Sequence, residues 1–185
     1  MRLSRALKTD QEIITRFITA LGSGSVALSS SKLPRPDFFI LAHTFIKEYI
    51  EEGFYKKEEL LIKVLEDGGF PPDNGPIGAI HTDQKKSISA AESMLAAARQ
   101  WEAGDTIARS ETGWGTSEFT STMRQHLERL KSLILPLIEQ TISVDEEHTI
   151  GDQMNSFVFE GELRNGAEKY IKLIEQLEEK LSDWK

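Results

Sequence analysis

Apolar side chains recur at helical spacing in the stretch MRQHLERLKSLILPLIEQ, residues 123–140. Intervals of three and four residues mark one face of an α-helix, whereas a half-buried strand would alternate. The apolar stripe consists of Leu127, Leu130, Ile134, Leu137 and Ile138. His126 and Lys131 lie on its two margins, about 70° either side of its centre at roughly 100° per residue. The stretch therefore predicts a helix that faces a core and carries a polar side chain on each border of that core.

The same period continues along nearly the whole chain. The main predicted helices cover residues 8–21, 36–67, 76–103 and 116–142. Glycine, serine and proline collect between them, at 22–34, 68–76 and 104–115, and predict loops. A capping-box pattern at Ser143 and Glu146 opens a shorter helix, a break is expected at 161–166, and a last helix follows. We expect an all-α fold, an up-down-up-down four-helix bundle with additional C-terminal helices, as one domain over residues 1–185.

Composition excludes several classes of protein. Aspartate and glutamate outnumber lysine and arginine by 30 to 22, and the net charge of −8 argues against nucleic acid as a partner. The chain has no cysteine, so disulfides, thiol catalysis and thiolate metal sites are absent. No apolar run approaches the roughly 18 residues of a membrane-spanning helix, and the N-terminus lacks an apolar signal core. We therefore expect a cytoplasmic protein with no membrane partner.

Three stretches resemble the hemerythrin-like, or HHE cation-binding, family. The longest is FIKEYIEEGFYKKEELLIKVLEDGGFPPDNGPIGAIHTDQ, in which the turn GFPPDNGPIG is the most specific part. HLERLKSLILPLIE and TDQEIITRF resemble the fourth-helix and first-helix motifs of that family. The resemblance implies four helices that bring histidines and carboxylates inward to hold two iron atoms. Members bind oxygen or sense oxygen and iron, and some are linked to nitric-oxide stress.

Transferred residue by residue, the resemblance implies a degenerate metal site. The remnant ligand positions are Gln11, Tyr55, Glu59, Gln84, His126 and Lys131. Only Glu59 and His126 keep the residue type of the family, because three histidines and one aspartate are replaced. The stretch before LEDGG is one residue shorter than the family form, so a register with Phe54 and Glu58 stays open, and neither register restores a histidine.

The loss of the iron site predicts which side chain replaces the positive charge of the metal. A protonated lysine has three donors and no acceptor, so Lys131 cannot ligate iron but can supply a positive charge. A buried Glu59 without a cation would be costly, and we expect it to pair with Lys131 inside the bundle. Tyr55 and the two glutamines would hydrogen-bond across the former cavity. The expected function is a non-catalytic structural, regulatory or interaction module with no cofactor, whose protein partner is unknown.

Two other interpretations remain open. A rearranged iron site could use His81 together with Glu59 and His126, and would then sense or carry oxygen, nitric oxide or iron. A generic interaction bundle unrelated to the family is the other, although the GFPPDNGPIG turn argues against it. Trp114 either forms a partner-binding loop tip or packs under the bundle.

Overall fold

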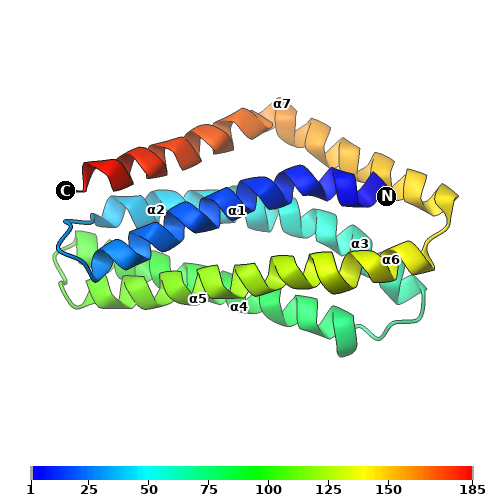
Figure 1. The fold of residues 1–185 in the computed structure, drawn as a ribbon, viewed down its shortest axis with the longest axis horizontal. Helices are drawn as coiled ribbons and strands as arrows, with labels where there is room; N and C mark the ends of the chain where they lie inside the picture. Colours follow the sequence, from blue (N-terminus) through cyan, green and yellow to red (C-terminus); the bar gives the residue numbers. More distant parts are fainter. Residues whose placement is uncertain (1, 185) are drawn as a thin grey trace.

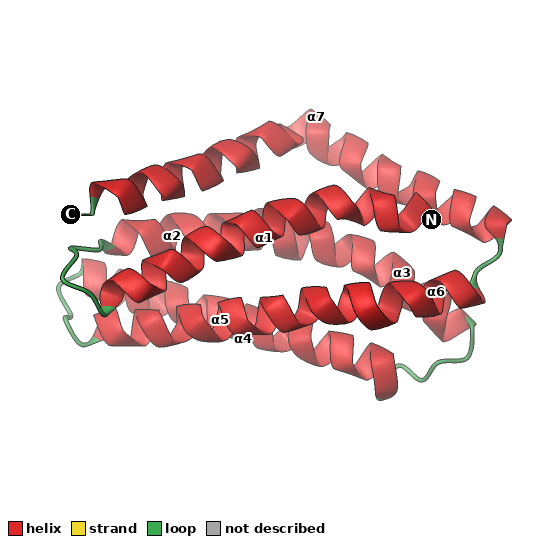
Figure 2. Ribbon diagram, viewed as in Figure 1, coloured by secondary structure: helices red, strands yellow, loops and turns green. Residues whose placement is uncertain are grey.

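The described chain is helical throughout (Figure 2). The structure is a computed structural model that describes residues 2–184, with the side chains of residues 3–156 and 166–184. Its elements are α1 (Arg2–Leu28), α2 (Pro36–Phe45), η1 (Ile46–Phe54), α3 (Tyr55–Asp67), α4 (Gly75–Glu102), α5 (Ala108–Arg129), η2 (Leu130–Ile134), α6 (Leu135–Thr141) and α7 (Val144–Asp183). The expectation of an all-α chain is confirmed. No helix in the described part of the chain is long and apolar enough to cross a membrane.

Long helical rods lie side by side, and the chain reverses direction at each connection between them (Figure 1). One rod is α2, η1 and α3 without interruption, and another is α5, η2 and α6. Their outer limits, Pro36 to Asp67 and Ala108 to Thr141, match the predicted helix 36–67 and cover all but the last residue of the predicted helix 116–142. Helix α4 packs along α5, α2 packs on α4, and α1 lies between α5 and α7.

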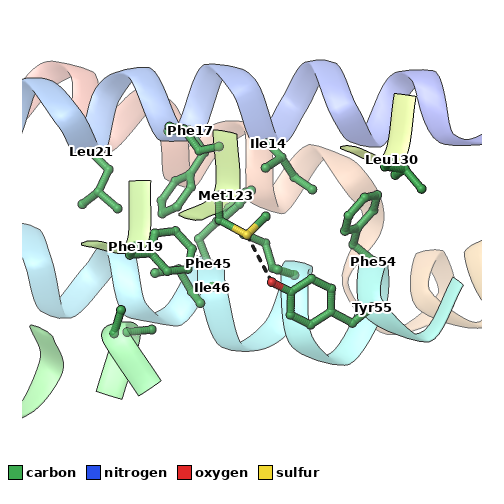
Figure 3. Close-up of a cluster of buried hydrophobic side chains, with 14 of the residues drawn as sticks. Ile14, Phe17, Leu21, Phe45, Ile46, Phe54, Tyr55, Phe119, Met123 and Leu130 are labelled. Atoms are coloured by element: carbon green, nitrogen blue, oxygen red, sulfur yellow. Dashed lines mark hydrogen bonds between the residues drawn. The ribbon is translucent and has the colours of Figure 1, made fainter. Parts of the chain in front are cut away.

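Phenylalanine rings at the centre join three of these rods. Phe17 of α1 stacks on Phe45 of α2 with ring centroids 4.1 Å apart, and it meets Phe119 of α5 edge to face at 6.5 Å. All three rings are fully buried. Figure 3 shows them beside Ile14, Met123 and other apolar side chains from the same rods. Aromatic pairs of this kind bury a large apolar area and hold the rods at a defined separation.

Helix α1 is longer at both ends than the predicted 8–21. The glycines and serines at 22–25 indicated a loop, yet they continue the helix to Leu28. A Cβ atom built on Gly24 would lie only 2.3 Å from Cε1 of Phe38, so the glycine makes room for that ring. Close helix packing therefore outweighs the low helix propensity of glycine here.

Helix α5 likewise begins earlier than predicted, at Ala108 instead of residue 116. Thr116, the first residue of the predicted helix, is buried within α5, and its hydroxyl donates to the Thr112 carbonyl over 2.7 Å. A Cβ atom on Gly115 would come within 2.9 Å of the Met94 backbone nitrogen. The glycine that suggested a loop instead permits the close approach of α4 and α5.

Two segments, η1 and η2, have the wider π-helical hydrogen bonding. The Tyr55 N–H donates to the Ile50 carbonyl, and the Leu135 N–H donates to the Leu130 carbonyl, so each bond spans five residues. Each segment shifts the direction of the side chains that follow it relative to a regular α-helix. Glu58 of α3 follows η1, whereas His126 and Arg129 of α5 precede η2.

The predicted capping box is confirmed at the start of α7. The Ser143 hydroxyl accepts from the Glu146 N–H, and the Glu146 carboxylate accepts from the Ser143 N–H over 2.8 Å. The break expected at 161–166 is not found, because one helix, Val144–Asp183, takes the place of the predicted shorter helix and the predicted last helix. Gly166 within it has a φ of +30°.

The close contact at Gly115 gives a prediction about stability. Gly115→Ala should lower the free energy of unfolding by about 1–2 kcal/mol, because overpacking costs more than the helix propensity that alanine adds. Gly151→Ala is the matched control, since a Cβ atom at Gly151 would meet nothing within 4 Å. That control should raise the free energy of unfolding by up to about 1 kcal/mol. Chemical denaturation of both variants measures the effects, and equal shifts in one direction would contradict the packing argument.

Candidate functional site

A cluster of buried polar side chains lies where α3, α4 and α5 meet. Glu58 comes from α3, Asp83 and Gln84 from α4, and His126 and Arg129 from α5. We call these five residues the central polar cluster. Phe54 and Tyr55 border it, with ring centroids 6.5 and 5.6 Å from that of His126. The cluster is therefore enclosed by the aromatic core and is not a set of surface charges.

The contact between Glu58 and His126 is its centre. His126 Nε2 lies 2.6 Å from Glu58 Oε1, and the two residues are 0% and 1% exposed. The side-chain amide of Gln84 donates to the other carboxylate oxygen, Oε2, over 2.8 Å. Both oxygens of Glu58 thus have a partner, as a buried carboxylate requires.

The opposite edge of the imidazole faces a second carboxylate. His126 Nδ1 lies 3.5 Å from Asp83 Oδ2, too far for a good hydrogen bond, and Nδ1 has no hydrogen-bond partner. Asp83 therefore acts on the ring as a charge. The Arg129 guanidinium forms an ion pair with the same Asp83 oxygen. His126 and Arg129 lie one helical turn apart on α5, so a single helix face supplies both cationic groups.

These charges determine the protonation of His126. Burial lowers the pKa of His126, but the charge of Glu58 and the contacts with Asp83 and Glu58 outweigh that effect and raise it from 6.5 to about 9. The ring is thus an imidazolium at neutral pH, with an N–H toward each carboxylate. Burial raises the pKa of Asp83, but His126 and Arg129 outweigh it, and the pKa is lowered overall.

Tyr55 continues the polar contacts toward the core. Its hydroxyl lies 2.6 Å from Ser87 Oγ, and Ser87 in turn donates to the Gln84 carbonyl over 2.8 Å. Met123 Sδ lies 3.1 Å from the same tyrosine hydroxyl, the contact drawn as a dashed line in Figure 3. Burial raises the pKa of Tyr55 well above its usual value, so the hydroxyl stays protonated.

The structure brings three of the six remnant ligand positions together. Tyr55, Gln84 and His126 surround the same point, as the resemblance implied. Gln11 is partly buried, and its Nε2 atom has no hydrogen-bond partner. Glu59 and Lys131 are exposed, and neither forms an ion pair among the residues that the structure describes.

The predicted Glu59–Lys131 pair is therefore wrong. The inward carboxylate is Glu58, the residue of the second register, and the inward cations are His126 and Arg129. Lys131 lies within the π segment η2, so a count at α-helical spacing from the apolar stripe misplaces it.

Sequence reasoning missed two features of this region. Arg129 was not singled out, although it lies three residues after His126 and next to the apolar stripe. A second buried ion pair was also missed: Lys57 Nζ lies 2.6 Å from Asp10 Oδ2, and the Tyr49 hydroxyl donates to Asp10 Oδ1 over 2.6 Å. Lys57 belongs to a charged run, KKEE, that gives no sign of which members face inward.

The arrangement of the acids and the imidazole does not suit a metal ion. The carboxylates lie on opposite edges of one ring, whereas a metal site needs the donor atoms to converge on one point. No group of three or more histidine, cysteine, aspartate or glutamate side chains is placed to hold a metal ion in the described part of the chain. His81, Glu59 and His126, the alternative ligand set, are described residues and do not form such a group.

Comparison of the chain with protein-family models, curated proteins and solved structures finds no match. The assignment of the chain to a family therefore stays a resemblance in the residues themselves.

The raised pKa of His126 predicts a pH dependence of stability. Because the pKa is higher in the folded state than the usual 6.5, the stabilisation is complete below pH 6.5 and is lost as the pH rises through about 9. The free energy of unfolding should fall over this window by an amount on the order of 3 kcal/mol. His126→Gln should remove that slope, as measured by chemical denaturation across the window. An unchanged slope in the variant would mean that another group titrates.

Proposed function

We propose that the chain is a hemerythrin-like bundle whose di-iron ligands are mostly replaced, and that it works as a non-catalytic structural, regulatory or interaction module. In this proposal α1, α2–α3, α4 and α5–α6 form an up-down-up-down core, with α7 packed on α1. A cytoplasmic location and an unidentified protein partner belong to the same proposal.

One observation carries the proposal: His126 has a carboxylate on each of its two ring edges. A metal-ligating imidazole must offer an unprotonated nitrogen to the metal. The nitrogen nearest Glu58 is within hydrogen-bond distance of that carboxylate, and Arg129 is already paired with Asp83. The charges of the cluster thus balance within the protein: two acids face an imidazolium and a guanidinium.

The same geometry supports a structural role. A di-iron centre would link helices through shared metal ligands, and here the cluster links α3, α4 and α5 by hydrogen bonds and ion pairs instead. A buried pair contributes little net stability against an apolar replacement, but removing one partner is costly. The cluster therefore specifies how the three helices face each other.

Iron content tests the loss of the metal site. Protein expressed in iron-supplemented medium should contain far less than one iron atom per chain, because no donor set among the described side chains converges on a metal position. Elemental analysis and the visible absorption spectrum are the measurements. Near two iron atoms per chain, with an oxo-bridge absorption band, would refute the proposal in favour of a rearranged site that senses or carries oxygen, nitric oxide or iron.

Neighbouring glutamates test the structural role. Glu58→Gln should cost on the order of 3 kcal/mol near neutral pH, because it leaves His126 and its charge without the closest acid. Glu59→Gln is the matched control one residue away and should change the free energy of unfolding by less than about 0.5 kcal/mol, as should Lys131→Met. Chemical denaturation compares the three. Equal effects at the two glutamates would contradict the assignment of Glu58 as the inward residue.

A further inference from the structure

A groove with an unusual lining runs between α1 and α5, away from the central polar cluster. Its volume is about 650 Å³, within the size range of small-molecule sites. The walls are mostly small and hydroxyl-bearing, with Thr19, Gly22 and Ser25 on α1 and Ser117 and Ser121 on α5. Arg124 and Lys32 complete the lining, which contains no acidic residue. A groove with two cations and no acid is unexpected in a chain whose net charge is −8.

The two cations are not used elsewhere. In the part of the chain that the structure describes, neither Arg124 nor Lys32 forms an ion pair. The Arg124 guanidinium lies close over Gly22, since a Cβ atom there would come within 3.3 Å of Nη2. The glycine thus leaves the guanidinium room to lie across α1. Its N–H donors are a planar fork that matches the oxygens of a phosphate or carboxylate group.

The two cations of the groove come from different parts of the chain. Arg124 belongs to α5 and lies beside Gly22 of α1, whereas Lys32 belongs to the loop that follows the end of α1 at Leu28. A ligand that contacts both cations would therefore join α5 to that loop.

One hydroxyl of the lining can serve as a further donor. Ser25 and Ser117 share a hydrogen bond with their oxygens 3.1 Å apart, and Ser25 donates to the Gly113 carbonyl over 3.4 Å, so Ser117 donates to Ser25 and both hydrogens are used. Ser121 donates to no group in the described part of the chain, and its hydroxyl is available to a ligand. The lining thus combines two charged donors with one neutral donor.

We propose that this groove binds a small molecule that carries two or more linked phosphate groups. Arg124 holds one phosphate group in a two-bond contact, Lys32 neutralises a second, and the Ser121 hydroxyl donates to a phosphate oxygen. The proposal is independent of the function of the central polar cluster, because it uses none of its residues.

Binding of pyrophosphate by the full chain tests the proposal. Isothermal titration at low ionic strength should detect one site per chain, and Arg124→Gln should weaken binding by about tenfold, the loss expected for a charged hydrogen bond. Lys32→Gln, in the loop after α1, should weaken it as well, and circular dichroism checks that each variant folds. Arg5→Gln is the matched control, because Arg5 is an exposed α1 residue outside the groove.

Three outcomes would overturn the proposal. The first is that pyrophosphate does not bind the wild-type chain. Arg5→Gln could weaken binding as much as Arg124→Gln, which would make the effect a general one of charge. Succinate, a dicarboxylate of similar length, could bind more tightly than pyrophosphate, which would assign the groove to carboxylates instead of phosphates.

Discussion

The contact between Glu58 and His126 is the interaction on which the interior of this bundle depends. It places an acid and an imidazolium 2.6 Å apart in a region with almost no solvent exposure. Neither group is tolerated there alone, since an unpaired buried charge is strongly unfavourable. Gln84 donates to the second oxygen of Glu58, Asp83 places a negative charge at the other edge of the imidazole, and Arg129 pairs with Asp83. The three helices are thereby joined through one charge-balanced unit.

Much of the fold could be predicted from the sequence, because the apolar period is long and regular. The rods beginning at Pro36 and Gly75 match the predicted segments closely, and the capping box at Ser143 is formed. The errors occur where glycine lies within a helix. Propensity treats Gly24 and Gly115 as loop residues, whereas each one makes room for a neighbouring element at a contact that only the assembled structure contains. At these two glycines, intrinsic helix propensity disfavours a helix and tertiary packing favours one, and packing has the larger effect.

The position of the site was predictable from the sequence, but the full set of residues that form it was not. The resemblance brought Tyr55, Gln84 and His126 to one point, and the structure agrees with that convergence. It did not identify the acid, because Glu58 and Glu59 are adjacent in the sequence and only one of them faces inward. It did not identify the cation, because Lys131 lies in a segment that departs from α-helical geometry. An apolar pattern interpreted at 3.6 residues per turn cannot show where the helix departs from 3.6 residues per turn. Arg129 became recognisable only when its partner Asp83 was placed.

The π segments also change the relation between distance along a helix and the direction of its side chains. In an α-helix, the number of residues between two points fixes both their distance and the relative direction of their side chains. Segment η1 lies between the start of α2 and the inward face of α3, so it changes that direction while both ends of the rod stay in place. The direction of the α3 side chains, Glu58 among them, is therefore set partly by η1 and not by the number of residues alone.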